Sequence, residues 1–341
     1  MASAEHLPPD PTTDEKIAEE PLGPVFISGR QHSGNTLMAF IFDRMNDCFS
    51  IDEEGVFFPH RRRLDGMKDP VVRATWIASH LKLRDQDPLA QEAVDHLAEW
   101  ARIHPKAPAL EQYLEVMRFV TERAGCRFFA QKGTAYIFHG REILDSIPNA
   151  RFIYLLRNPY DVCASKKRRR PERERIVGWV LSWNKGIRLV EAMKRAEPDR
   201  TLLIRYEDLV QDPKPAIEEI CRFVGVPFEE EMLNVPHVNP SDAKFQVVEG
   251  SKGINQSRLF YYVDRLHPAE VAGIDLLVAK QKLHAYYPDL PHLRNRISLW
   301  NRIGAVGLVL VGFPWYLRSK IRFSKGKLGP TAWAWLRQRM R

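Results

Sequence analysis

The sequence predicts an α/β fold, in which helices flank a parallel β-sheet and a basic helical appendage follows at the C-terminus. Two observations support this prediction. Short apolar runs alternate with helical stretches over most of the 341 residues, and strands that alternate with helices form right-handed units whose strands run parallel. Hydrophobic residues make up 44% of the chain and charged residues 28%, an ordinary balance for a protein with a buried core.

Changes in composition give the boundaries. Residues 1–23 are acidic and proline-rich and lack the apolar stretch of a secretory signal, so we expect a disordered leader without a membrane anchor. Residues 24–293 carry the alternating pattern and form the α/β domain. Residues 294–341 contain eleven Lys and Arg and no acidic residue. Because the whole chain has a net charge of only +8, its body is nearly neutral, which argues against a nucleic-acid partner.

The first strand is predicted over Pro24–Gly29 (PVFISG), and the first helix over TLMAFIFDRM. The stretch GRQHSGNT between them is close to the loop that binds nucleotide triphosphates, G-x-x-x-x-G-K-[ST], except that Asn35 replaces the lysine. Its two glycines allow the backbone to wrap a phosphate, and Ser33 and Thr36 offer hydroxyls near a helix N-terminus. A tight turn without a ligand is the alternative.

Two later strands end at a basic residue. RFFAQKG predicts a strand that ends at Lys132, and ARFIYLLRNP predicts one that ends at Arg157. The patterns over residues 69–123 and over GREILDSIPN are helical. Since ligands of parallel sheets bind at the carboxyl ends of strands, we expect Gly29, Lys132 and Arg157 to share one edge.

A helix and then a further strand are predicted after the second of these strands. Asn158 and Pro159 are typical of a helix start, and this helix carries Ser165 two turns later. The preceding arginine and this serine suit one phosphate group, although an arginine in an ordinary ion pair is the alternative. TLLIRYEDL (201–209) predicts a last strand, and KPAIEEICRFVGV predicts a helix that ends near Gly225.

Together these stretches resemble the sulfotransferase family that uses 3′-phosphoadenosine 5′-phosphosulfate (PAPS). GRQHSGNTL occupies the place of that family's G-x-P-R-S-G-T-T-L loop, and LLRNPYDVCAS matches its R-D-P-R-D-V segment with a later serine. RYEDLVQDPKPAIEEICRFVGVPFEEEML is similar to the family's Y-E-D-L segment, and QKGTAYIFHGREILDSIPNARFIYLLR to its K-T-P segment. The resemblance covers roughly residues 24–290, with four motifs in the family's order.

The resemblance implies a P-loop-like fold and a PAPS site. The early loop would hold the 5′-phosphosulfate, and Arg157 and Ser165 would hold the 3′-phosphate. EGSKGINQSR resembles the family's late nucleotide loop, which brings in Ser251 and Lys252. The implied PAPS-binding residues are Gly29, His32, Ser33, Gly34, Asn35, Thr36, Arg157, Ser165, Ser251 and Lys252.

The loop departs from the family pattern at two positions. His32 stands where the family has Lys or Arg, and Asn35 stands where it has threonine. Histidine titrates near pH ~6.5 in its free form, and a phosphate neighbour favours its charged form. We therefore expect His32 to stabilise the leaving phosphate or to act as an acid or base. A histidine that only caps the turn is the alternative.

Sulfuryl transfer needs a base for the acceptor and a cation for the leaving group. IDEEGVFFPHRRR is similar to the E-E-x-x-x-x-P stretch of protein-tyrosine sulfotransferases, which implies that Glu54 is the base and Glu53 its neighbour. Lys132 matches the family lysine that neutralises the bridging oxygen. A solvated acidic turn and an ordinary surface lysine are the alternatives. His60 and His139 are weaker base candidates.

Two further stretches are rich in basic residues. KKRRRPERER (Lys166–Arg175) is either a solvated face, an attractor of the anionic donor or an acidic acceptor, or a nuclear signal. The largely apolar stretch Ile303–Leu317, interrupted by Pro314, would span about 22 Å as a helix, short of a ~30 Å hydrocarbon core. Aromatic and basic flanks favour contact of residues 294–341 with an anionic membrane surface over burial against the domain.

The sequence thus predicts a PAPS-dependent sulfotransferase that acts on a hydroxyl or amine. Small-molecule, lipid, glycan and peptide acceptors stay open. We expect a cytoplasmic protein, because its four cysteines are far apart and suit a reducing compartment. Contact through residues 294–341 would make it peripheral on the cytoplasmic membrane face. No metal site is predicted, since no His/Cys cluster is present. The alternatives are a magnesium-dependent P-loop kinase and a non-catalytic nucleotide- or membrane-binding module.

Overall fold

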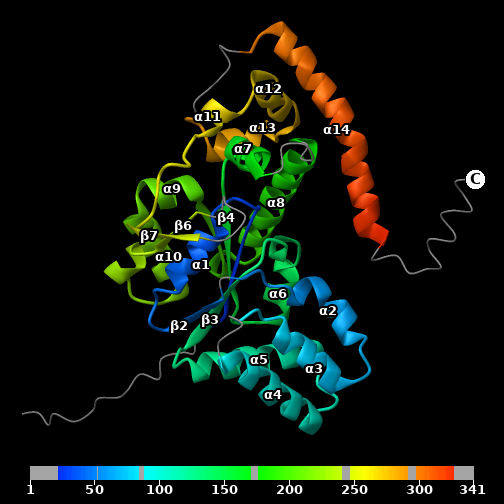
Figure 1. The fold of residues 1–341 in the computed structure, drawn as a ribbon, viewed down its shortest axis with the longest axis vertical. Coiled ribbons are helices and arrows are strands. Elements are labelled where there is room, and N and C mark those ends of the chain that lie inside the picture. The colour runs from blue at the N-terminus through cyan, green and yellow to red at the C-terminus, as the bar shows by residue number, and fades with distance from the viewer. Residues whose placement is uncertain are drawn as a thin grey trace, which may run out of the picture.

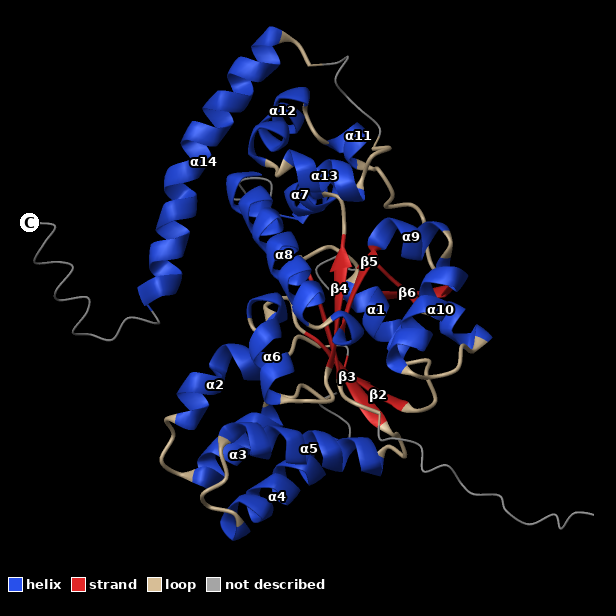
Figure 2. Cartoon of the chain, turned by 180° about the vertical axis from the view of Figure 1, so that it is seen from behind, coloured by secondary structure: helices blue, strands red, loops and turns tan. Residues whose placement is uncertain are grey.

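A five-stranded parallel sheet forms the centre of the molecule (Figures 1 and 2). The structure, a computed structural model, describes residues 22–51, 53–83, 88–169, 176–239, 246–290 and 297–325. The strand order is β2-β3-β1-β4-β5. The strands are β1 Val25–Gly29, β2 Cys48–Ile51, β3 Phe128–Lys132, β4 Arg151–Leu156 and β5 Thr201–Arg205. The predicted α/β architecture is confirmed.

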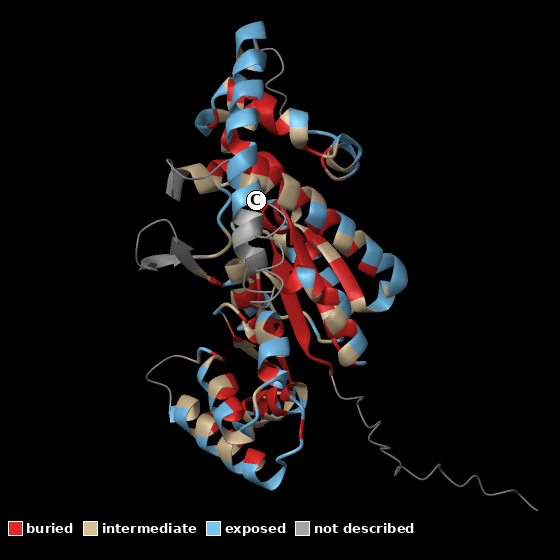
Figure 3. Ribbon diagram, turned by 90° about the vertical axis from the view of Figure 1, so that its right-hand side faces the viewer, coloured by how far each residue is buried: buried red, intermediate tan, exposed pale blue. Residues whose placement is uncertain are grey.

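Both faces of this sheet are buried, which explains why its strands read as continuous apolar runs. Successive side chains point to opposite faces. Along β4, Phe152 and Tyr154 therefore pack in one hydrophobic cluster, while Ile153 and Leu155 pack in the other. Figure 3 shows the strands as the most thoroughly buried part of the chain.

Helices cover each face of the sheet (Figure 2). One face lies under α1 Asn35–Phe42, α9 Tyr206–Gln211 and α10 Pro213–Val224. The other lies under α5 Ala109–Arg123, α6 Gly140–Ser146 and the long α8 Ile176–Ala196. As predicted, α10 ends at Gly225, whose φ of 86° is a conformation that favours glycine.

A helical lobe extends the domain beyond the sheet (Figure 1). It contains α2 Phe57–Asp65, α3 Pro70–Ser79 and α4 Pro88–Ile103, which pack with α5. The Asp69 carboxylate caps α3 by accepting bonds from the amides of Val71 and Val72. The buried Arg73 guanidinium joins α3 to α5 by donating to Gln112 over 2.8 Å.

The described residues after α10 contain a β-hairpin and several helices. β6 Pro236–Asn239 and β7 Gln246–Lys252 pair antiparallel. The helices α7 Pro159–Arg169, α11 Tyr262–Arg265, α12 Pro268–Leu277 and α13 Lys280–Tyr286 cluster beyond the carboxyl end of the sheet (Figure 1). Three short 3₁₀ turns lie elsewhere: Tyr136–Phe138, Pro198–Arg200 and Glu230–Leu233.

The last helix, α14 Leu299–Lys325, runs along the outside of the molecule and continues through Pro314. It packs on α12 and α8 through a narrow seam that includes the fully buried Ala305. Much of its described surface is exposed to solvent (Figure 3) and carries large hydrophobic side chains. The exposed large hydrophobic side chains are Leu299, Trp300, Ile303, Val306, Leu308, Leu310, Val311, Phe313, Trp315 and Leu317. Within the described residues, this helix included, none is long and apolar enough to cross a membrane.

Two details of the predicted elements are wrong. The strand predicted over 201–209 ends at Arg205, and helix α9 starts at Tyr206. The helix considered over Ile303–Leu317 is longer, because α14 runs from Leu299 to Lys325 and continues through Pro314. Residues 1–21, most of the predicted leader, and residues 326–341 lie outside the described residues, as does the predicted boundary at 293/294.

Candidate active site

The loop between β1 and α1 has the backbone of a tight phosphate-binding turn. The Ser33 amide donates to the Arg30 carbonyl over 2.9 Å, and the Asn35 side-chain amide donates to the Gly29 carbonyl over 3.0 Å. A Cβ at Gly29 would lie 2.6 Å from the backbone oxygen of Leu155, so the close approach requires glycine. Asn35 therefore ties the end of the loop back to its beginning, a role that lysine would not fill.

Two residues of this loop adopt positive φ. His32 has a φ of 71° and Gly34 a φ of 95°. A Cβ at Gly34 would lie 2.6 Å from the Tyr206 ring, so both the dihedral and the contact call for glycine. His32 is a non-glycine residue in the left-handed region, and such residues cluster at functional sites.

The loop also contains a buried hydroxyl. Ser33 is 1% exposed, and its Oγ has no hydrogen-bond partner in the part of the chain that the structure describes. A buried polar group without a partner costs about 1–3 kcal/mol, so this hydroxyl fits a bound ligand with acceptor oxygens. The turn also precedes a helix N-terminus, whose partial positive charge favours phosphate.

Arg157 follows β4 and lies directly against this loop. Its guanidinium donates to the carbonyl of His32 over 2.8 Å and to the carbonyl of Arg258 over 2.5 Å. It also lies 4.4 Å above the Tyr206 ring and 3.6 Å from the Asp161 carboxylate. The side chain is only 5% exposed, and its Nε finds no partner among the described residues. Arg157 thus joins the early loop to the late segment and keeps one buried donor available.

A buried polar network holds the backbone after Arg157. The Asn158 side chain donates to both Glu207 and Asp161, over 2.7 and 2.9 Å. Asp161 accepts from the amides of Phe260 and Tyr262, each over 3.0 Å. Burial raises the pKa of Asp161 and of Glu207. Glu207, the glutamate of the Y-E-D-L segment, therefore supports the backbone of the site from the protein interior and does not line the site.

Glu54 meets the turn that follows β3. Its carboxylate accepts from the Thr134 amide over 2.5 Å and from the Thr134 hydroxyl over 2.9 Å. The Gly55 amide donates to the Lys132 carbonyl over 2.7 Å. Glu54 and Lys132 therefore lie at neighbouring strand ends, on the same edge of the sheet as the phosphate loop. Glu53 is exposed beside them.

The other candidates divide into three groups. Ser165 is half-buried in α7, as predicted, and forms no hydrogen bond with Arg157 within the described chain. The side chains of Ser251 and Lys252 lie outside the described residues, although their backbone belongs to β7.

The two weaker base candidates have local structural contacts. His60 contacts the Val56 carbonyl, and His139 contacts Glu142.

The basic run after Ser165 is only partly described. Residues 170–175 lie outside the described residues. Lys167 forms an ion pair with Glu270 over 2.6 Å, and Lys166 lies 4.4 Å from the Trp179 ring. The two described lysines thus have contacts within the protein.

Helix α8 contributes two residues that sequence reasoning missed. Trp183 is buried and donates its ring N–H to the Arg157 carbonyl over 2.8 Å. The ring of Trp179 lies 4.7 Å from the Arg30 guanidinium. Both tryptophans lie one turn apart on one face, which is the periodicity that places them together. The sequence pattern alone gives no reason to direct that face toward the loop.

The comparison with known proteins now decides the family. A profile described as "Sulfotransferase family" matches residues 24–230, which span the sheet, the loop and α10. The chain belongs to the sulfotransferase family.

Individual sulfotransferases match over shorter stretches. Sulfotransferase 2A1 of Homo sapiens is 35% identical over 134 residues, which are 34% of this chain and 45% of the human protein. A putative protein-tyrosine sulfotransferase of Caenorhabditis elegans is 25% identical over 127 residues, or 34% of this chain and 49% of the nematode protein. The chain thus spans about half the length of the curated sulfotransferases that it matches.

A solved structure is similar over most of the chain. The sulfotransferase domain from the curacin biosynthetic pathway superimposes with a TM-score of 0.56 at 21% identity, covering 79% of this chain and 99% of that domain. This likeness supports the sulfotransferase fold. The P-loop-like sheet predicted from the sequence is confirmed by its strand order and by this neighbour.

Proposed function

We propose that the protein transfers a sulfuryl group from PAPS to a hydroxyl or amine acceptor. The observation that carries this proposal is the contact between the early loop and Arg157, which brings two anion-binding groups together at the carboxyl end of β1 and β4. An adenosine with two phosphate groups needs such a pair, in which the early loop binds the 5′-phosphosulfate and Arg157 binds the 3′-phosphate. Family membership supports the same donor.

In this reaction the acceptor oxygen or nitrogen attacks sulfur as the bond from sulfur to the phosphate oxygen breaks. Glu54 takes the acceptor proton, and adenosine 3′,5′-bisphosphate leaves. Lys132, His32 and the loop amides stabilise the negative charge on the leaving phosphate. Arg157, Ser165, Ser251 and Lys252 hold the nucleotide. In kinases a metal ion stabilises the charge of the phosphates. Here Lys132, His32 and Arg157 have that role, so the proposed reaction uses no metal ion.

A transfer assay tests the function. Incubating the chain with ³⁵S-labelled PAPS and a panel of phenols, sterols, peptides and lipid extracts is expected to give a labelled product. The rate should be unchanged by EDTA, because no step of the proposed reaction needs a dissolved metal ion. Magnesium-dependent hydrolysis of ATP would instead favour the kinase alternative. Tight binding of adenosine 3′,5′-bisphosphate with no turnover on any acceptor would favour a non-catalytic module.

We also propose that α14 contacts an anionic membrane surface. Its exposed apolar side chains from Leu299 to Leu317 lie along one helix, and such a patch marks an interaction site when it is this extensive. The chain from residue 294 onward has no acidic residue, so its charge complements anionic lipids. A lipid-linked acceptor would fit this location.

Vesicle co-sedimentation measures this contact. Replacing Leu310 and Val311, which are 67% and 56% exposed, by serine is expected to lower the partition coefficient onto phosphatidylserine vesicles by about 100-fold or more, because each fully inserted apolar side chain contributes about 1.5–3 kcal/mol. Ile103→Ser is the matched control, since Ile103 is 67% exposed on α4. Equal sedimentation of the double variant and the parent chain would contradict the proposal.

A further inference from the structure

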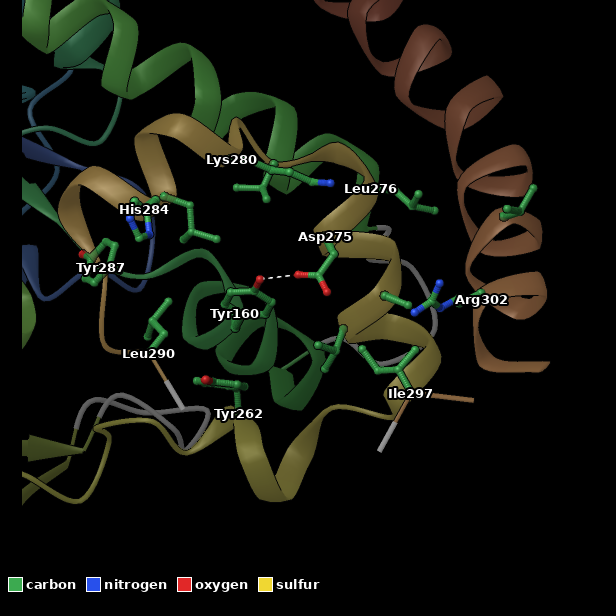
Figure 4. A pocket seen from close by; sticks show the side chains of 15 residues that line it. Tyr160, Tyr262, Asp275, Leu276, Lys280, His284, Tyr287, Leu290, Ile297 and Arg302 are labelled. Atoms are coloured by element: carbon green, nitrogen blue, oxygen red, sulfur yellow. Dashed lines mark hydrogen bonds between the residues drawn. The ribbon is translucent and has the colours of Figure 1, made fainter. Parts of the chain in front are cut away.

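A second cavity lies away from the phosphate loop. It has a volume of about 680 Å³ and is enclosed by α7, α11, α12, α13 and α14 (Figure 4). Pockets of 300–1,000 Å³ suit drug-sized ligands. None of the residues that line it belongs to the phosphate loop, and neither Glu54, Lys132 nor Arg157 is among them. The cavity is therefore a site separate from the one described above.

The walls of this cavity are mostly apolar. Aliphatic side chains come from three helices and from the chain before α14, and three tyrosines add their rings. These residues are Val271, Ala272, Leu276, Val278, Leu283, Leu290, Ile297, Val306, Tyr160, Tyr262 and Tyr287. Such walls favour an alkyl chain, which loses its contact with water there.

Basic side chains lie at the rim of the cavity. Lys280 and His284 come from α13, and Arg302 extends from α14 toward α12 (Figure 4). None of the three forms an ion pair or side-chain hydrogen bond within the described chain. The one acidic lining residue, Asp275, accepts a hydrogen bond from Tyr160. An apolar interior with cations at its mouth complements a molecule that has an alkyl chain and an anionic head.

We propose that this cavity binds a long-chain fatty acid. The alkyl chain lies among the aliphatic and tyrosine side chains, and the carboxylate meets Arg302 and Lys280 at the rim. Arg302 presents a planar fork that matches a carboxylate. Leu276 and Val306 line the cavity and are 58% and 48% exposed, so the cavity reaches the outer surface where α12 and α14 meet. This proposal does not depend on the transfer reaction, because it concerns a different set of side chains.

Calorimetry with the full chain tests the proposal. Oleate is the probe, and oleyl alcohol and oleylamine, which have the same chain length, are the controls for the head group. We expect oleate to bind at one site, oleyl alcohol about tenfold more weakly and oleylamine more weakly still. The Arg302→Gln variant should bind oleate about tenfold more weakly than the parent chain, since one charge-assisted bond is lost. Lys106→Gln, an exposed change on the helical lobe, should bind oleate as the parent does.

A second variant separates the cavity from the outer surface of α14. Ala272→Phe fills the interior and leaves the exposed face unchanged, so it should abolish saturable oleate binding. Thermal unfolding shows whether this variant is folded; if it is not, the Arg302→Gln result decides. Equal binding of oleate and oleyl alcohol, or no loss in Arg302→Gln, would overturn the proposal. Oleate binding that Ala272→Phe retains would assign it to the α14 surface instead.

Discussion

Arg157→Ala is expected to weaken the binding of adenosine 3′,5′-bisphosphate by roughly 100-fold. The guanidinium is 5% exposed and has one donor, Nε, without a partner among the described residues. A buried hydrogen bond to a charged group contributes about 1.5–3 kcal/mol, so the loss of this one bond accounts for a factor of roughly this size. Isothermal calorimetry measures the loss directly.

A second nucleotide serves as the control for this prediction. Adenosine 5′-monophosphate lacks the 3′-phosphate, so its affinity should change much less when Arg157 is replaced. Arg157→Lys keeps the charge but loses the fork, and should recover only part of the affinity. If both nucleotides lose affinity equally, the side chain acts through the loops that it joins, and its assignment to the 3′-phosphate is wrong.

Glu54→Gln is expected to lower kcat by roughly 10²–10⁴-fold, the usual contribution of a positioned general base. The change keeps the size of the side chain and an oxygen for the Thr134 amide, which is now 2.5 Å from the carboxylate. Affinity for adenosine 3′,5′-bisphosphate should stay within about twofold of the parent, because the base acts on the acceptor. Initial rates with labelled PAPS give kcat.

Two matched variants make this result interpretable. Glu53→Gln changes the same residue type one position earlier, where the side chain is exposed, and should leave kcat nearly unchanged. Thr134→Val removes the hydroxyl that donates to Glu54 but keeps the carboxylate. If Thr134→Val lowers kcat as much as Glu54→Gln does, then Glu54 orders the turn and another group takes the proton.

Much of the fold could be predicted from the sequence. The strands that end at Gly29, Lys132 and Arg157 are continuous apolar runs because both sheet faces are buried, and runs of that kind are easy to recognise. Strand β2, Cys48–Ile51, was missed because its four residues include the polar Ser50 and form no such run. The prediction carried β5 four residues too far, since the apolar pattern continues into α9.

The site was predictable in its parts but not in its contacts. The sequence placed the loop, Lys132 and Arg157 at one edge, and their strand ends do lie there. It could not indicate that Arg157 bonds to the carbonyls of His32 and Arg258, because backbone acceptors carry no sequence signal. The link from Glu54 to Thr134 was not expected either, because a contact between side chains 80 residues apart leaves no local pattern in the sequence.

Helix α8 contacts both the backbone of Arg157 and the outer helix α14. At one point its Trp183 holds the backbone of Arg157, and near its start Gly178 lies against the Tyr316 ring of α14. One helix is therefore shared by the proposed nucleotide site and by the proposed membrane-contacting helix α14. If lipid bound at α14 changes the affinity for the nucleotide by some factor, linkage requires that the nucleotide changes the affinity for lipid by the same factor. Lipid would then set the PAPS concentration at which the nucleotide site is half saturated.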